Sequence, residues 1–376
     1  MSAKGYKQSS ADSAFLCVLR FALDTVPGRG ALPTDVDWEA VYVAASRQAV
    51  VGVVAGCIGR LPEGERPKGQ LLMKWIAAAA AVRKANIRVY ADCVRLSRRM
   101  AADGRVPCIL KGQGNALMYP DAFSRSPGDI DVWLQGSALE IARYARRYVP
   151  GANVEYHHVD FPVFRHTPVE IHFVPSFMGN LLHERRLNRY FADNSAGQFS
   201  HKVRLPEDIG GEICTPTDGF NRIFQLTHIM HHFFFEGIGM RQVVDYYYLL
   251  RRGFSDVERA ADVAVIKRLG MSRFAAALMY VLHSGLGLGE EYLLVEPDEK
   301  VGRLLLSEIM QAGNFGFHDA RYDFKGIPLW KQYLLETRRN LRFALHFPSE
   351  TVWGRPLSRF YHAYYKWRLR KLLDKH

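Results

Sequence analysis

The 376-residue sequence has few cysteines, and no two of them are closely spaced. None belongs to a CxxC motif, so the sequence predicts neither a zinc ribbon nor a disulfide framework. The five cysteines are Cys17, Cys57, Cys93, Cys108 and Cys214. Most lie among apolar neighbours, which favours buried free thiols in a reducing compartment. A cytoplasmic location is therefore expected.

Long apolar runs are missing as well. The longest covers residues 49–58, short of the roughly 20 residues that a membrane-spanning helix needs. The opening sequence, MSAKGYKQSS, is polar and lacks the apolar centre of a signal peptide. Hydrophobic residues still make up 48% of the chain, enough for a sizeable core, so disorder is excluded as the main state.

Acidic residues are too few to balance the basic ones. The 50 Lys and Arg against 38 Asp and Glu give a net charge of +12, which suggests an anionic partner such as nucleotide, nucleic acid or acidic lipid. Residues 338–376 hold ten basic and two acidic residues, so this tail alone carries +8. The remainder is only mildly basic, which weakens a whole-protein argument for nucleic acid.

The hydrophobic pattern predicts an α+β protein of several units, as the chain length suggests. A small mixed-sheet core is expected between an N-terminal helical segment and a larger C-terminal helical domain. The expected units are the helical segment 1–104, the α/β core 105–210, the helical domain 211–345 and a basic aromatic tail helix 346–376.

Within these units, a long helix over 75–100 is predicted to end at Asp103-Gly104. The core is predicted to contain strands over 106–110, 130–134, 154–165 and 169–174 and helices over 113–119 and 138–148. The helical domain is predicted to contain helices over 217–235, 240–252, 256–268, 272–284, 299–312 and 328–345.

Asp129 and Asp131 are the first candidates for chemistry. They flank Ile130 at the start of a predicted strand, and alternation along a strand puts both carboxylates on one face. Two neighbouring carboxylates repel each other unless a cation lies between them. Mg²⁺ (or Mn²⁺) suits such a pair and keeps positions open for phosphate oxygens. Gly128, directly before the pair, lets the backbone approach a ligand closely.

Glu170 offers a third carboxylate. In the apolar strand 169–174, alternation places Glu170 and His172 together on the face opposite Val169 and Ile171. If this strand pairs with the Asp129/Asp131 strand, three carboxylates converge. Such a set can hold two divalent ions about 4 Å apart for in-line displacement at phosphorus.

Lys111 and Gly112 lie where the strand 106–110 gives way to a predicted helix. A helix N-terminus with an unobstructed glycine amide binds phosphate, and Lys111 and Arg125 can add positive charge. An isolated DxD motif is common by chance and usually marks a solvated turn. The three features together favour a metal-dependent, phosphate-handling site.

These motifs carry a resemblance. LKG at 110–112, Arg125, GDIDVW at 128–133 and VEIHF at 169–173 resemble the nucleotidyltransferase fold of the DNA polymerase beta superfamily. More narrowly, they are similar to an uncharacterised bacterial nucleotidyltransferase family with an LKG…R…GDID signature. The resemblance implies that Asp129 and Asp131 bind the metal and that Glu170 is the third carboxylate. The usual Gly-Ser or Gly-Gly turn of the superfamily is replaced by the sequence 111–114, KGQG.

A second block, 228–245, resembles the histidines, Gly-x-Arg and Asp of the same family's helical domain. His228 and His232 are four residues apart, which is the spacing of two zinc ligands but without the HExxH glutamate. A polar cleft wall and a core histidine are the alternatives. Arg241 and Asp245 have the spacing of an ion pair on one helix face. We expect this helix to pack over the α/β core and form the acceptor side, placing one of these groups within about 10 Å of the carboxylates.

The functional hypothesis is Mg²⁺-dependent transfer of a nucleotidyl group from a nucleoside triphosphate, with ATP expected, to an acceptor hydroxyl with release of pyrophosphate. Asp129, Asp131 and Glu170 would be catalytic, and Glu170 would help deprotonate the acceptor. Lys111, Gly112, Arg125 and Gly128 would bind the nucleotide, and His172, His228, His232, Arg241 and Asp245 would line the acceptor side. The acceptor remains open between a small molecule, a glycan precursor, a protein and RNA. The alternatives are a catalytically silent nucleotide-binding or scaffold protein and an RNA-modifying toxin acting on tRNA.

The tail combines basic and aromatic residues over 355–373. Pro356 suits a first helical turn. An apolar stripe is predicted from Leu357, Phe360, Tyr361, Tyr364, Trp367 (or Arg368) and Leu372. The plainest interpretation is a terminal helix that docks this stripe on the helical domain. Peripheral contact with an anionic membrane, or with RNA, is the alternative, because Lys and Arg beside Trp and Tyr are typical of interfacial helices.

Overall fold

The computed structural model describes residues 10–23, 32, 35–316, 319 and 328–374. It begins with helices that match the predicted N-terminal segment. They are α1 (Ser10–Ala22), α2 (Trp38–Arg47), α3 (Val51–Ile58) and α4 (Gly69–Ala102). Helix α4 ends beside Gly104, whose φ of +71° suits a glycine.

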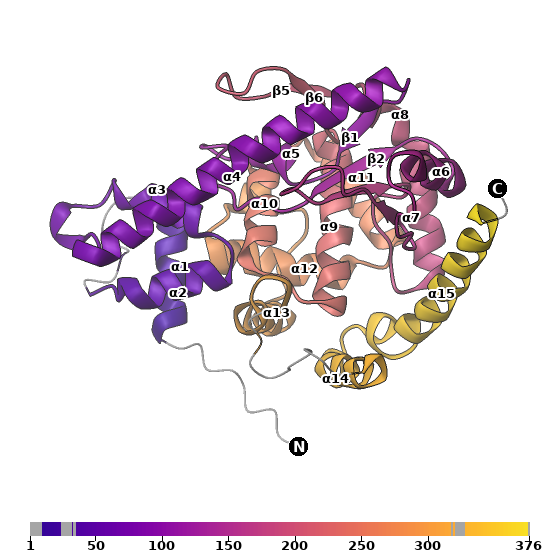
Figure 1. Ribbon diagram of the computed structural model, residues 1–376. Coiled ribbons are helices and arrows are strands. Elements are labelled where there is room, and N and C mark those ends of the chain that lie inside the picture. The colour runs from indigo at the N-terminus through magenta and orange to yellow at the C-terminus, as the bar shows by residue number, and fades with distance from the viewer. Residues whose placement is uncertain (1–9, 24–31, 33–34, 317–318, 320–327, 375–376) are drawn as a thin grey trace.

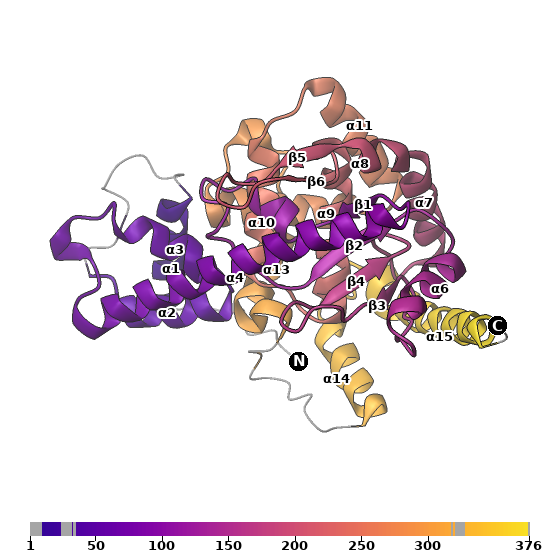
Figure 2. The same ribbon diagram turned by 45° about the horizontal axis from the view of Figure 1, so that its top comes forward.

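Helix α4 connects two parts of the molecule. Its first half packs against α2 and α3, and its second half lies across the sheet (Figures 1 and 2). Trp75 belongs to the core of the helical parts, whereas Tyr90, Cys93 and Leu96 belong to the core beneath the sheet. One helix therefore fixes the N-terminal helices relative to the sheet.

The expected mixed sheet is present, with four short strands in the order β1-β2-β4-β3. The strands are β1 (Pro107–Ile109), β2 (Ile130–Leu134), β3 (His158–Asp160) and β4 (Val169–His172). Strand β2 runs parallel to β4, and the other two pairs are antiparallel. A parallel pair needs a crossover, and α6 (Ala138–Tyr148) lies within it, begun by a Ser137–Glu140 capping box.

The strands expected over 106–110 and 169–174 are each two residues too long, and two other predicted elements of the core differ more from the structure. The run 154–165 contains only β3 and one bridge between Val154 and Val159, because Pro162 cannot donate a ladder hydrogen bond. The helix expected over 113–119 is only α5 (Gln113–Ala116). After it, Met118 and Tyr119 make hydrogen bonds to the carbonyls three residues earlier, and Pro120 prevents continuation.

Four elements between β4 and residue 217 were not predicted. Helix α7 (Leu181–Asp193) starts at Asn180, whose side chain accepts hydrogen bonds from the N–H groups of Leu182 and His183. Helix α8 (Ser195–Ser200) follows, and then a hairpin of β5 (Lys202–Arg204) and β6 (Glu212–Cys214). The expected unit boundary at 210/211 falls between the two strands of this hairpin.

The C-terminal helices agree with the predicted spans to within a few residues. They are α9 (Asp218–Phe235), α10 (Met240–Arg251), α11 (Asp256–Arg268), α12 (Ser272–Tyr280), α13 (Glu299–Ala312) and α14 (Leu329–Leu341). Helices α9 and α10 are buried along most of their length, and α10 contacts α5 beside the sheet. The aromatic run 246–248 is core packing, as expected.

The predicted tail helix is α15 (Gly354–Leu373), which packs on α6 and α7 at the edge of the molecule (Figure 1). Docking of its apolar stripe is not what the structure shows. The six stripe residues are 39–78% exposed, and the buried apolar contacts come from Leu369 and Leu373 instead. The helix is rotated so that its leucines, together with Tyr365, fill the contact, and the larger aromatic face points outward. None of the described helices is both long enough and apolar enough to cross a membrane.

Candidate active site

The pairing of β2 with β4 brings the predicted carboxylates together. Asp131 in β2 lies directly opposite Glu170 in β4, and Asp129 comes immediately before β2. Because the two strands are parallel, their equivalent positions meet on one face of the sheet. Asp131 is buried, and the Glu170 side chain is 30% exposed toward a cavity of about 910 Å³ that Asp129 also lines.

Asp131 is held between two cationic side chains. Lys111 Nζ lies 3.2 Å from Asp131 Oδ2, and His172 Nε2 donates to Oδ1 at 2.9 Å. Burial opposes ionisation of Asp131, but Lys111 and His172 outweigh it and hold its pKa below the ordinary value. In turn, hydrogen bonds to Asp131 and Glu170 overcome the effect of burial on His172 and raise its pKa to about 9. His172 is therefore protonated at neutral pH.

Asp129 has the opposite environment. Repulsion from Asp131, with burial, raises its pKa above the ordinary value, and Lys111 only partly offsets this. A cation between the two carboxylates would remove the repulsion. Asp131, Glu170 and His172 each offer a ligand atom, and these atoms lie within 4.8 Å of one another. The carboxylates of Asp131 and Glu170 therefore fit a divalent ion, whereas Asp129 lies outside this group of three, on the same cavity.

Lys111 and Gly112 follow β1 directly. Gly112 has a φ of +64°, and a Cβ there would lie 3.4 Å from the carbonyl oxygen of Asp129. Glycine is thus required for the turn that carries Lys111 to the carboxylates. Helix α5 has only four residues, so its dipole is small and the positive charge at this corner comes from Lys111.

Arg125 and Asp245 form a buried ion pair. Arg125 Nε and Nη2 donate to the two Asp245 oxygens at 2.7 and 2.8 Å, and Tyr119 donates to the same carboxylate at 2.6 Å. Sequence spacing had suggested Arg241 as the partner of Asp245. In the structure, Asp245 in α10 pairs instead with Arg125, which lies in the loop before β2. This structural ion pair holds the loop in place beside the site.

Arg241 lies at the start of α10, next to Gly128. Its Nη1 donates to the Ser126 carbonyl at 3.3 Å, and a Cβ on Gly128 would lie 3.5 Å from the same nitrogen. Burial and Arg125 lower the pKa of Arg241 to about 10, so it remains charged. Arg241 lines the large cavity together with Lys111 and Asp129, whereas Arg125 lines a smaller one beside it.

Helix α9 brings histidines to the same cavity. Lys111 Nζ donates to His228 Nε2 at 3.3 Å, and the same Nζ is 3.2 Å from Asp131. His228 therefore lies well inside the expected 10 Å of the carboxylates. Burial and Lys111 keep the pKa of His228 well below the ordinary value. His232 Nδ1 is 3.0 Å from Glu236 at the other end of this wall.

Sequence reasoning missed part of the lining. His157, His158 and Phe177 come from the segments around β3 and β4, and His231 from α9. The only local signal was the His157-His158 pair at the start of the short strand β3. With these residues, the cavity is large enough for a nucleotide-sized ligand.

A small mixed sheet with carboxylates on adjacent parallel strands, covered by helices, defines an α+β protein of nucleotidyltransferase type. The chain belongs to the family described as uncharacterised nucleotidyltransferase, whose profile matches residues 34–287. The matched range includes α4, the four-stranded sheet and helices α9–α12, so the family suggested by the sequence is confirmed. A search of curated proteins finds no match.

Proposed function

We propose that the protein transfers a nucleotidyl group from a nucleoside triphosphate, ATP in the first instance, to an acceptor hydroxyl. The observation that carries this proposal is the register of β2 and β4, which sets Asp131 opposite Glu170 with Asp129 one residue before the strand. Bound Mg²⁺ (or Mn²⁺) would neutralise charge on the phosphates and on the attacking oxygen. Asp129, Asp131 and Glu170 are the residues that would hold it.

In the proposed step the acceptor oxygen attacks the α-phosphorus and loses its proton to Glu170, whose side chain is 30% exposed against 1% for Asp131. The new oxygen–phosphorus bond forms as the bond to the bridging oxygen breaks, and pyrophosphate leaves. Lys111 and Arg241 would orient and neutralise the phosphates, with Gly112 and Gly128 allowing close approach. Arg125 and Asp245 hold the loop that carries Gly128.

The acceptor side of the cavity is assigned to the histidine wall. His228 and His232 from α9, with His172 from β4, line the same cavity as Gly128. This wall suits hydrogen bonding to a polar acceptor, whether a small molecule, a glycan precursor, a protein side chain or RNA. RNA would need a continuous basic groove beside the carboxylates, and most of the excess charge lies in the tail instead. A catalytically silent scaffold is less well supported, because the carboxylate set is intact.

The test is pyrophosphate release by wild type and by Asp129→Ala/Asp131→Ala, with Mg²⁺ and each triphosphate, using cell lysate as the acceptor source. We expect the double variant to lose at least about 10³-fold in rate, because preorganised charge supplies most of the acceleration. Asp193→Ala, an exposed position, is the control. Full activity in the double variant would contradict the proposal.

We also propose that the exposed face of α15 contacts an anionic membrane surface. Among the described residues, twelve of the nineteen exposed large apolar side chains lie within 330–372. On α15 the exposed cations Arg368, Arg370 and Lys371 come directly after Trp367, the last of these aromatics. Aromatic rings beside Lys and Arg suit the interface of an anionic bilayer, where each cation contributes about 1 kcal/mol.

Flotation with vesicles of neutral or anionic lipid tests this contact. Phe360→Ser/Trp367→Ser should reduce recovery with anionic vesicles about tenfold, since both side chains are already exposed and the fold does not depend on them. Met73→Ser/Ile76→Ser removes two equally exposed apolar groups from α4 and should have no effect. Equal recovery of all three proteins would rule out a role for the tail.

Finally, we propose a reducing compartment such as the cytoplasm. All five cysteines are free thiols, and four are buried. Burial raises the pKa of Cys57 to about 12, so this thiol is unreactive.

A further inference from the structure

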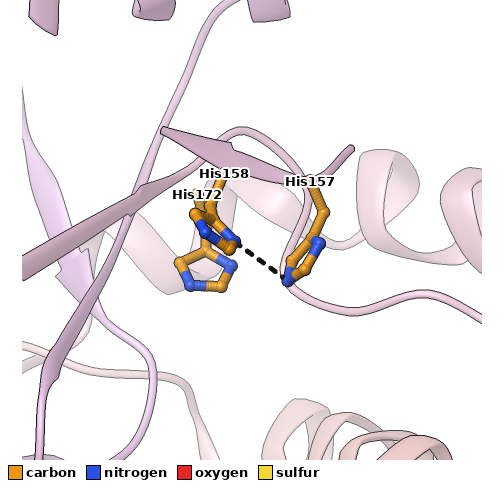
Figure 3. A group of neighbouring side chains, drawn as sticks. All are labelled: His157, His158 and His172. Atoms are coloured by element: carbon orange, nitrogen blue, oxygen red, sulfur yellow. Dashed lines mark hydrogen bonds between the residues drawn. The ribbon is translucent and has the colours of Figure 1, made fainter. Parts of the chain in front are cut away.

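Three imidazoles meet on the cavity side of β3 and β4. His158 in β3 is the cross-strand partner of His172 in β4, and His157 precedes β3. Figure 3 shows the three rings gathered together, with His158 Nδ1 3.2 Å from His157 Nε2. One nitrogen from each ring lies within 4.8 Å of the other two. The group therefore has the composition and spacing of a metal site.

The second observation is a buried nitrogen without a partner. His172 is 3% exposed, and its Nδ1 makes no hydrogen bond among the described residues, although Nε2 donates to Asp131. A buried polar atom normally has a partner, and an imidazole held at one nitrogen by a carboxylate is oriented to bind a metal through the other.

The spacing of the other ligand atoms also fits one ion. His157 Nε2 and His158 Nδ1 are 3.2 Å apart, as expected of two nitrogens bound about 2 Å from the same metal. The Glu170 carboxylate lies 3.5 Å from His158 Nδ1 and can supply an oxygen ligand at the edge of the group.

We propose that His157, His158 and His172, with Glu170 at the edge, bind a first-row transition metal ion of the Zn²⁺ type. The site differs from the Mg²⁺ site of the proposed function in its donors, because imidazoles select Zn²⁺ and its neighbours whereas carboxylates and water suit Mg²⁺. Glu170 lies between the two sites. His172 would lose its Nδ1 proton to solvent on binding the ion through that nitrogen, and would keep its hydrogen bond to Asp131 through Nε2. Asp131 thereby links the two sites, as an Mg²⁺ ligand in one and an outer-shell partner in the other.

The test uses Co²⁺ as a spectroscopic probe of the full-length protein after chelator treatment. Imidazole-bound Co²⁺ of low coordination number has strong visible absorption, whereas Co²⁺ bound only by oxygens in octahedral geometry absorbs weakly. We expect wild type to bind one strongly absorbing ion that Zn²⁺ displaces. His157→Ala should weaken this binding by about 10- to 100-fold or more, and His157→Gln, which conserves volume, should do the same.

His346→Ala, a histidine outside the cavity, is the matched control and should bind Co²⁺ as wild type does. Asp129→Asn should keep the absorbing ion even if it abolishes pyrophosphate release. The two proposals can therefore fail separately. Wild-type protein that shows only weak octahedral absorption would overturn the imidazole site, as would unchanged affinity in correctly folded His157→Gln.

Discussion

Two clusters of buried charge lie next to each other in this molecule and are built differently. In the first, Arg125 and Asp245 neutralise each other through two hydrogen bonds, and the Tyr119 hydroxyl donates a third to the carboxylate. In the second, Asp129 and Asp131 repel each other, and Lys111 and a protonated histidine balance them only in part. The first cluster is complete without a ligand. The second would be stabilised by an added cation. This is expected of a ligand-binding site and not of an ion pair whose role is only structural.

Removing one partner from the complete cluster should have the largest effect on stability. Asp245→Ala leaves the Arg125 guanidinium buried without its carboxylate, so we expect a loss of about 3–5 kcal/mol in the free energy of unfolding. Urea unfolding measures it, with the exposed Asp193→Ala as the control. A loss below about 1 kcal/mol would show that Arg125 finds another partner and that the Arg125–Asp245 pair does not hold the loop in place.

In the second cluster, His172 should make the free energy of unfolding of the metal-free protein depend on pH. The pKa of His172 is raised to about 9 in the folded protein, from an ordinary value of 6.5. Its contribution is therefore fully present below about pH 6.5 and is lost as the pH rises through 9, a change of about 3 kcal/mol. The stability difference between wild type and His172→Gln should shrink over this window. A difference that stays constant would contradict a protonated His172.

The smallest expected effect has the opposite sign. Asp129→Asn removes a carboxylate whose ionisation is opposed by Asp131, so the metal-free variant should be more stable than wild type by about 1 kcal/mol. Added Mg²⁺ should raise the melting temperature of wild type and have less effect on the variant. If Asp129→Asn destabilises the metal-free protein, the two aspartates do not repel each other as inferred.

Local signals predicted much of the site. The bounds of β2 and α6 are those expected, because alternation marks the strand and the Ser137–Glu140 capping box marks the helix start. The placement of Glu170 followed from the same alternation once β4 paired with β2. Helix α7 was overlooked although its signal was present, namely Asn180 as N-cap with Leu187, Tyr190 and Phe191 at helical spacing.

The sequence by itself determined the helical and α/β parts, the Asp129–Asp131 pair, Lys111-Gly112 and membership in the nucleotidyltransferase family. These depend on periodicity and on neighbours along the chain. Only the tertiary structure decided that Asp245 pairs with Arg125, since 120 residues separate them and spacing on one helix favours Arg241. It also decided which face of α15 is buried. That choice depends on the surface that α15 meets, where Leu369 and Leu373 join the core beneath the sheet and His362 stacks on Tyr156.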